Sequence, residues 1–208
     1  HRCVVNGTSH IFKHFGAGTL SGCRTFLTKD FIINPIMFFE ELEILNKKGF
    51  FPKVMFDNCS VTTPYDMMLN QWIEEDRGDN RHGSCGLGIN ETVTRQQTSE
   101  FALSVFDLLS PRFEETVKSI RDNYVAMRCN QQNIVLSKER LAILYDNRIT
   151  DNFIMQCYNM LNYEGTTILS KVRPTVTGGA WSADLTPNAD ITPSGTVYKI
   201  TETADRYS

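Results

Sequence analysis

The feature that most constrains this chain is a short run with three glycines and two small nucleophilic side chains, Gly83-Ser84-Cys85-Gly86-Leu87-Gly88. Glycine adopts positive φ and lets the backbone approach a ligand closely, so consecutive N–H groups can point toward an anion. Ser84 adds a hydroxyl that can donate to a phosphate oxygen, and Arg81 and His82 add positive charge beside it. These residues predict a phosphate-binding loop. A polar surface loop, with His82 as a solvated histidine, fits the same composition equally well.

The run differs from a Walker-type phosphate loop. That motif requires Gly-Lys-Ser/Thr after the glycines, whereas Ile89 and Asn90 follow Gly88 here. Backbone N–H groups would therefore carry most of the attraction for a phosphate. The candidate substrate-binding residues are Gly83, Ser84, Cys85, Gly86 and Gly88.

Composition excludes several classes of function. The 208 residues are 41% hydrophobic and 22% charged, with a net charge of −3, which is typical of a globular protein and argues against a surface that coats nucleic acid. No run reaches the roughly 18 apolar residues of a membrane span. The six cysteines are scattered without a C-x-x-C pair, which favours reduced thiols in the cytoplasm over a disulfide framework or a zinc site. We therefore expect no nucleic-acid partner, no membrane partner and no bound metal among these side chains.

Hydrophobic patterning predicts an α/β fold in residues 1–98, because strands and helices alternate there. Asn6-Gly7 is a hairpin signal, and Asn34-Pro35 and Thr63-Pro64 are typical helix starts. The expected elements are a hairpin of residues 2–5 and 9–15, a strand at 31–33, a helix from 35 to about 49, a strand at 53–56 and a helix from 64 to the glycine-rich loop. His10 and His14 are expected to be surface or hairpin residues.

Residues 99–171 are predicted to form a helical subdomain whose apolar stripes belong to the core. Four stripes support this, beginning at Phe101, Phe113, Leu141 and Phe153. Residues 172–208 are rich in Thr, Pro, Gly, Ala and Asp, and predict a β-rich tail with strands at 180–183 and 196–201. We expect this tail to pack independently of the rest.

Taken in order, the motifs of the first 165 residues resemble the adenylosuccinate synthetase family. The residues that carry the resemblance are His1, Cys3–Gly7, Gly16–Gly18, Ile32–Pro35, Phe38–Leu42, Arg77-Gly78 and the glycine-rich loop through Ile89. The ordered set is more specific than any one motif. It implies a partial adenylosuccinate-synthetase-like sheet, and it is similar to a divergent branch related to the 2-aminoadenylosuccinate synthetases of phages.

The resemblance implies a chemistry. In that family GTP phosphorylates the 6-oxygen of inosine monophosphate, and the amine of aspartate then displaces the phosphate. The resemblance therefore implies a purine nucleoside monophosphate and aspartate as partners, and Mg²⁺ with GTP or ATP as cofactors. It also implies a homodimer and a location in the cytoplasm, or in the host cytoplasm if the chain is phage-encoded. The family's histidine acts as an acid near the 6-oxygen, so His1 is the catalytic candidate. An exposed terminal histidine is the alternative for His1.

The sequence also departs from the family. Cys85 and Leu87 stand where the family usually has Thr and Arg. The family's nucleotide loop is expected upstream of His1, and its second half after Tyr163, so we expect a fragment without ligase turnover on its own. The tail from about Gly178 resembles β-rich modules of phage tail fibres. Two hypotheses follow, part of a purine-nucleotide ligase, or a phage virion protein with a non-catalytic passenger domain.

Overall fold

The structure of this chain is a computed structural model that describes residues 2–5, 7–80, 83–169, 186–187 and 198–199. It separates into two compact units that alternate along the sequence. The first unit holds His1–Thr28, Glu41–Asp57 and Asn159–Ser208, and the second holds Lys29–Glu40 and Asn58–Tyr158. Helices α1 (Pro35–Lys47) and α7 (Asn147–Asn162) each contribute residues to both units.

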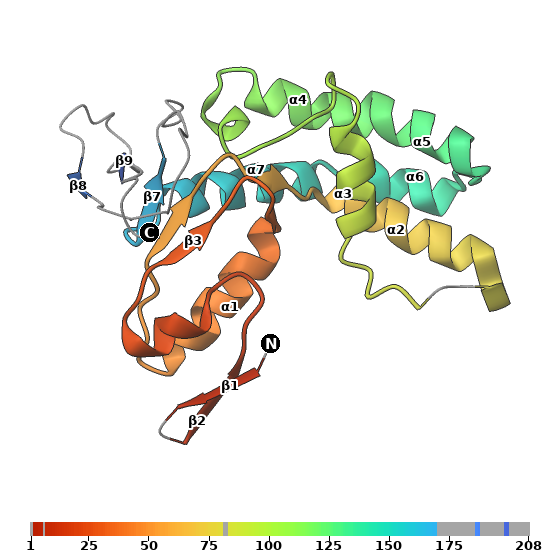
Figure 1. The fold of residues 1–208 in the computed structure, drawn as a ribbon. Helices are drawn as coiled ribbons and strands as arrows, with labels where there is room; N and C mark the ends of the chain where they lie inside the picture. The colour runs from red at the N-terminus through yellow and green to blue at the C-terminus, as the bar shows by residue number, and fades with distance from the viewer. Residues whose placement is uncertain (1, 6, 81–82, 170–185, 188–197, 200–208) are drawn as a thin grey trace, which may run out of the picture. The chain divides into compact units, whose positions relative to one another are not determined.

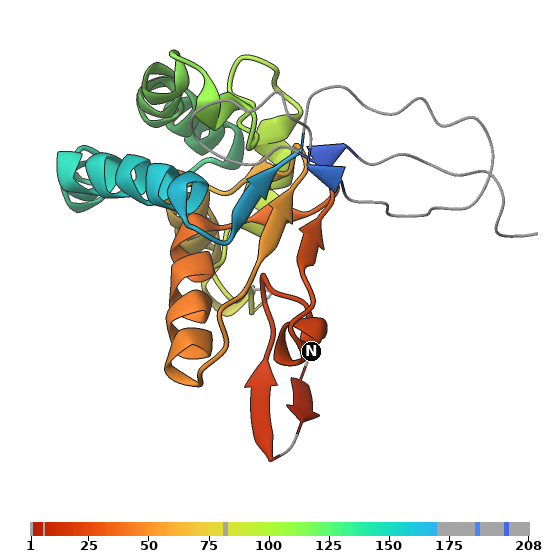
Figure 2. The same ribbon diagram turned by 90° about the vertical axis from the view of Figure 1, so that its left-hand side faces the viewer.

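A three-stranded parallel sheet forms the centre of the first unit. Its order is β3 (Thr25–Leu27), β5 (Val54–Phe56) and β7 (Thr166–Ile168), and the three arrows lie side by side in Figure 2. All three residues of β5 are buried, as expected for the central strand of a parallel sheet covered on both faces. The strand predicted at 53–56 is therefore confirmed. Strands β3 and β7 were not predicted.

The same unit carries the predicted hairpin, which is β1 (Arg2–Val5) paired antiparallel with β2 (Thr8–Ile11) (Figure 1). Gly7 takes the left-handed conformation, with φ of 78°, that such a tight turn requires. The returning strand ends at Ile11, four residues earlier than predicted. A 3₁₀ turn, η1 (Ala17–Ser21), follows.

His10 and His14 were expected to be surface or hairpin residues. His10 does lie in the hairpin strand β2, but both side chains are buried, so a surface position was wrong for both. Both pack around the buried carboxylate of Glu41. The Nε2 atom of His10 lies 3.1 Å from Glu41 Oε1, and the backbone N–H groups of Lys13 and His14 donate to the same carboxylate at 3.0 and 2.6 Å. Burial alone would raise the pKa of Glu41, but the hydrogen bonds from His14, Lys13 and His10 outweigh it and lower the pKa to about 2.

The second unit is mostly helical around a short parallel pair, β4 (Ile32–Ile33) with β6 (Ser60–Val61). Its α-helices are labelled in Figure 1 and have these bounds: α2 (Pro64–Arg77), α3 (Ile89–Gln96), α4 (Phe113–Ser119), α5 (Val125–Gln132) and α6 (Lys138–Leu144). A π-helical turn, η4 (Ile120–Tyr124), lies between α4 and α5. Two 3₁₀ turns, η2 (Gly78–Asn80) and η3 (Asp107–Leu109), complete the unit.

The apolar stripe that begins at Phe101 is not a helix, which corrects the prediction. Residues Phe101, Leu103 and Val105 are buried in strict alternation, the pattern of an extended segment. This segment pairs with β6 on the edge opposite β4. Val61 N donates to Leu103 O, and Val105 N donates to the carbonyl of Cys59, the residue before β6, both at 2.9 Å. The spacing of the apolar residues is compatible with a helix and with an extended segment, and pairing with β6 makes the segment extended.

The other predicted helices are confirmed, and their starts follow from local chemistry. Asn34 Oδ1 caps α1 by accepting from Ile36 N at 3.0 Å. Thr63 and Asp66 form a capping box at the start of α2. The stripes beginning at Phe113 and Phe153 face the core, since both side chains are about 1% exposed. In the part of the chain that the structure describes, no helix has both the length and the apolarity needed to cross a membrane.

Of the predicted tail, the structure describes one antiparallel pair, β8 (Thr186–Pro187) with β9 (Tyr198–Lys199). The strand predicted at 180–183 lies outside the described residues, and Tyr198–Lys199 falls within the strand predicted at 196–201. The division at residues 98 and 171 stays a prediction. The α/β class, with a parallel sheet and helices, is confirmed.

Candidate phosphate-binding site

The glycine-rich loop lies in the second unit and connects the end of α2, through η2, to the start of α3. The structure therefore places Gly83, Ser84, Cys85, Gly86 and Gly88 together in one segment, as their adjacency requires. The three glycines all have positive φ, of 71°, 70° and 72°. The loop thus has the left-handed backbone that the sequence suggested. Arg81, His82 and the catalytic candidate His1 lie outside the described residues.

Gly88 is the glycine that the fold requires most strictly. It is the N-cap residue of α3, and a Cβ added there would lie 2.8 Å from both the carbonyl carbon of Asp66 and the nitrogen of Met67. Real Cβ atoms do not approach backbone atoms so closely. At Gly83 no atom lies within 4 Å of an added Cβ, and at Gly86 the nearest is the Gln71 side chain at 3.7 Å. Gly88 therefore lets the loop pass directly over the first turn of α2.

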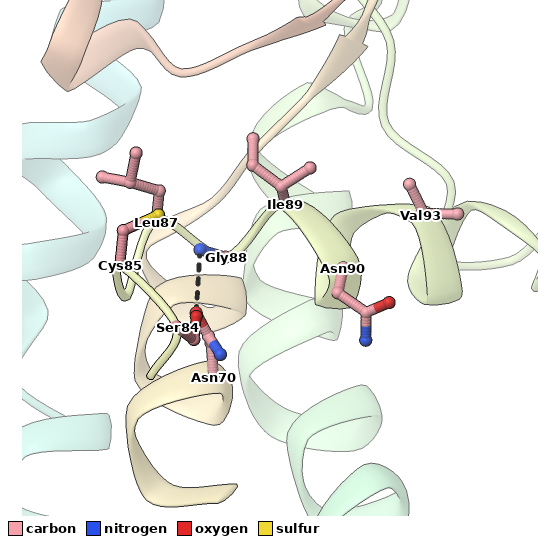
Figure 3. A pocket seen from close by; sticks show the side chains of 8 residues that line it. All are labelled: Asn70, Ser84, Cys85, Leu87, Gly88, Ile89, Asn90 and Val93. Atoms are coloured by element: carbon pink, nitrogen blue, oxygen red, sulfur yellow. Dashed lines mark hydrogen bonds between the residues drawn. The ribbon is translucent and has the colours of Figure 1, made fainter. Parts of the chain in front are cut away.

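Asn70 on α2 tethers the loop. Its Oδ1 atom accepts from the Ser84 hydroxyl at 2.8 Å and from the Gly88 N–H at 3.4 Å, the second of which is drawn in Figure 3. The Ser84 oxygen in turn accepts from the Gly86 N–H at 3.3 Å. The hydroxyl that the sequence assigned to a phosphate is thus donated to Asn70 here, and donation to a ligand requires it to rotate. The role of Ser84 toward phosphate stays a prediction.

Glu74 lies one helical turn beyond Asn70 and also contacts the loop. Its Oε2 atom accepts from the Ser84 N–H at 3.3 Å, and its Oε1 atom accepts from Arg77 Nη1 at 2.9 Å. Residues four apart on a helix share a face, so Asn70 and Glu74 present an amide oxygen and a carboxylate to the same loop. The Asn70 and Glu74 side chains of α2 therefore accept hydrogen bonds from donors of the loop.

A pocket of about 340 Å³ opens beside the loop (Figure 3). The side chains of Ile89 and Val93 project from one side of α3, and that of Asn90 projects from the other. The first-turn N–H groups of α3 have no carbonyl partner within the helix, and they carry the positive end of its dipole. The pocket therefore combines a mainly apolar wall with backbone donors. Its lining residues are Asn70, Ser84, Cys85, Leu87, Gly88, Ile89, Asn90 and Val93.

A second, more polar hollow of about 170 Å³ shares Asn70, Ser84 and Asn90 with the first. Its lining includes an ion pair in which Arg128 donates to Glu91 through Nε at 2.7 Å and Nη2 at 3.1 Å. Glu91 is buried, and its hydrogen bond to Arg128 raises the pKa of that guanidinium further. This pair fixes α5 against the first turn of α3.

A fully buried ion pair joins α2 to α3, the two helices that flank the loop. Arg95 on α3 donates to the Asp66 carboxylate through Nε and Nη2, both at 2.9 Å, and to the carbonyl oxygens of Phe101 and Val61 at 2.7 Å. Thr92 donates its hydroxyl to the carbonyl of Gly88 at 2.9 Å. Because buried charges need complete pairing, this network fixes how α3 meets α2.

Sequence reasoning missed the groups that hold the loop, which are Asn70, Glu74 and the pair Asp66–Arg95. Two signals in the sequence point to them. Thr63 and Asp66 have capping-box spacing, and the four-residue spacing of Asn70 and Glu74 puts two polar acceptors on one helix face just before the glycines. Neither signal shows which loop atoms these side chains bind.

The described residues do not provide a metal site of their own. Within residues 2–5, 7–80 and 83–169, no group of three or more His, Cys, Asp or Glu side chains is placed to hold a metal ion.

Comparison with known proteins agrees with this architecture. Residues 1–168 match the sequence profile of the adenylosuccinate synthetase family. The adenylosuccinate synthetase of Acaryochloris marina is 32% identical over 141 residues, which are 66% of this chain and 30% of that protein. That of Borrelia duttonii is 24% identical over 111 residues, 53% of this chain and 26% of that protein. Adenylosuccinate synthetase 2 of Chromobacterium violaceum is 27% identical over 129 residues, 60% and 30% respectively.

The chain spans less than a third of the length of these curated relatives. The profile nevertheless covers 168 of its 208 residues, including the glycine-rich loop and the helices that hold it. This chain belongs to the adenylosuccinate synthetase family.

Proposed function

We propose that the glycine-rich loop binds the phosphate of a purine nucleoside monophosphate. The observation that carries this proposal is the path of the loop, because three glycines of positive φ lead into the N-terminus of α3 beside a pocket of about 340 Å³. Backbone N–H groups at such a helix start attract anions through hydrogen bonds and the helix dipole. The apolar side chains Leu87, Ile89 and Val93 provide a surface suited to the nucleoside.

Family membership extends the proposal to a reaction. The chain is proposed to be part of a ligase that joins aspartate to the 6-position of a purine monophosphate, with hydrolysis of GTP or ATP. The described residues would bind and orient the monophosphate. A bound triphosphate would supply the phosphoryl group that activates the 6-oxygen, leaving as the diphosphate, and Mg²⁺ would offset the charge on the phosphates. His1 as the acid near that oxygen, a homodimer, and an origin in a phage-like branch belong to the same proposal and rest on sequence resemblance.

Calorimetric titration of the purified chain tests the binding step. Inosine, guanosine and deoxyguanosine monophosphates are compared with inosine, which lacks the phosphate. Ser84→Ala should weaken monophosphate binding about tenfold, because it removes the hydroxyl that links Asn70 to the Gly86 N–H and can donate to phosphate. Ser21→Ala, at an exposed position in the other unit, is the matched control. Absence of binding by every monophosphate at millimolar concentration, both to wild type and to the Glu74→Gln variant, would refute the proposal.

A further inference from the structure

Glu74 places a carboxylate at a donor that a bound phosphate would use. Its Oε2 atom accepts the Ser84 N–H at 3.3 Å. Carboxylate and phosphate oxygens are alike as acceptors of backbone N–H groups, and both form charge-assisted hydrogen bonds. A ligand phosphate at this donor would therefore meet a negative charge already in place.

The charge of Glu74 is partly withdrawn from water. Its side chain is 14% exposed, and its other oxygen accepts from Arg77 Nη1 at 2.9 Å. Charges withdrawn from solvent act on their neighbours more strongly than exposed ones, because water screens them less. Glu74 also lines the polar hollow that shares Asn70, Ser84 and Asn90 with the main pocket.

We propose that Glu74 is an internal competitor for the phosphate site of the loop. The ligand phosphate takes the Ser84 N–H, the Glu74 carboxylate withdraws from it, and Arg77 keeps the displaced carboxylate paired. The charge of Glu74 therefore sets the affinity of the site for anions and keeps the loop closed on α2 when no ligand is bound. This inference rests on the proposed binding of a purine monophosphate.

The test is a calorimetric titration of inosine monophosphate and of inosine into the full chain and its variants. Glu74→Gln retains an acceptor for the Ser84 N–H but removes the charge, so it should bind inosine monophosphate about tenfold more tightly than wild type. The gain should shrink at 1 M salt, and inosine should show no gain. Glu75→Gln is the matched control, since this neighbour is 63% exposed and binds Arg140 instead.

Two further variants keep the test decisive. Glu74→Ala should tighten binding in the same direction, and it replaces Glu74→Gln if thermal melting shows that variant to be unfolded. In an Arg77→Gln background, Glu74→Gln should still tighten binding. Loss of the gain in that background would mean that a released Arg77 causes it, which overturns the proposal.

The outcomes separate the inference from the proposed function. Tighter binding by Glu74→Gln supports competition, including the case in which wild type shows no detectable binding. Wild-type binding with an equal or weaker Glu74→Gln variant overturns the competition and leaves phosphate binding standing. Failure of both wild type and Glu74→Gln to bind inosine monophosphate at millimolar concentration overturns both.

Discussion

Replacing Gly88 by alanine should destabilise the protein far more than replacing Gly83. Both residues have positive φ, 72° and 71°, so each substitution carries the left-handed penalty of roughly 1–2 kcal/mol. At Gly88 the new Cβ also lies 2.8 Å from the backbone of Asp66 and Met67, where no flexible side chain can move aside. Relieving such a contact typically costs a further 1–3 kcal/mol.

Urea denaturation, followed by circular dichroism, measures both changes. Gly83→Ala should lower the free energy of unfolding by about 1–2 kcal/mol and Gly88→Ala by about 2–5 kcal/mol. For a chain of this size, each kcal/mol lowers the melting temperature by about 2–4 °C. Equal effects of the two substitutions, or a larger effect at Gly83, would refute the claim that the loop passes directly over the first turn of α2.

Three further changes test other parts of the account. Arg95→Met should lower the free energy of unfolding by about 3–5 kcal/mol, because it leaves the Asp66 carboxylate buried without its ion-pair partner. Arg148→Met, at the surface, should change that free energy by less than about 0.5 kcal/mol. Glu41, with its pKa lowered from 4.5 to about 2, should contribute about 3 kcal/mol to stability above pH 4.5, and this contribution decreases as the pH falls from 4.5 toward 2. Urea titrations of Glu41→Gln should therefore show the full loss at pH 7 and roughly half of it at pH 3, where the wild-type carboxylate is still mostly ionised. Cys85→Thr, which restores the usual family residue, should bind inosine monophosphate as tightly as wild type or more tightly by calorimetry.

Elements with local signals were predictable from the sequence. Helix α1 begins where Asn34 supplies a cap and Pro35 fits the first turn, and α2 begins at the capping box of Thr63 and Asp66. The hairpin follows from Asn6-Gly7. In each case the residues that decide the structure are neighbours in the chain.

Elements set by distant partners were not predictable. Strand β3 has three residues, and its place depends on pairing with β5, about 29 residues later. The segment from Phe101 to Val105 is extended because β6 offers it free backbone groups, which apolar spacing alone does not reveal. The His10 ring contacts the buried carboxylate of Glu41, some 30 residues away, and His14 lies beside the same carboxylate, to which its backbone N–H donates.

The candidate site divides in the same way. Composition pointed to the loop, because glycines of positive φ and a helix start are local features. The groups that hold it, Asn70 and Glu74, bind atoms 10 to 18 residues away. The sequence does not rank the three glycines, whereas the contact with α2 makes Gly88 the one of the three that cannot carry a side chain.

The most direct test of the central claim is an amide-resolved NMR titration with inosine monophosphate and, separately, with inosine. If the loop binds the phosphate, the amide signals of Ser84, Gly86, Gly88 and Ile89 shift saturably with the monophosphate and stay in place with the nucleoside. Shifts confined to residues away from the loop, or equal shifts with inosine, would contradict it.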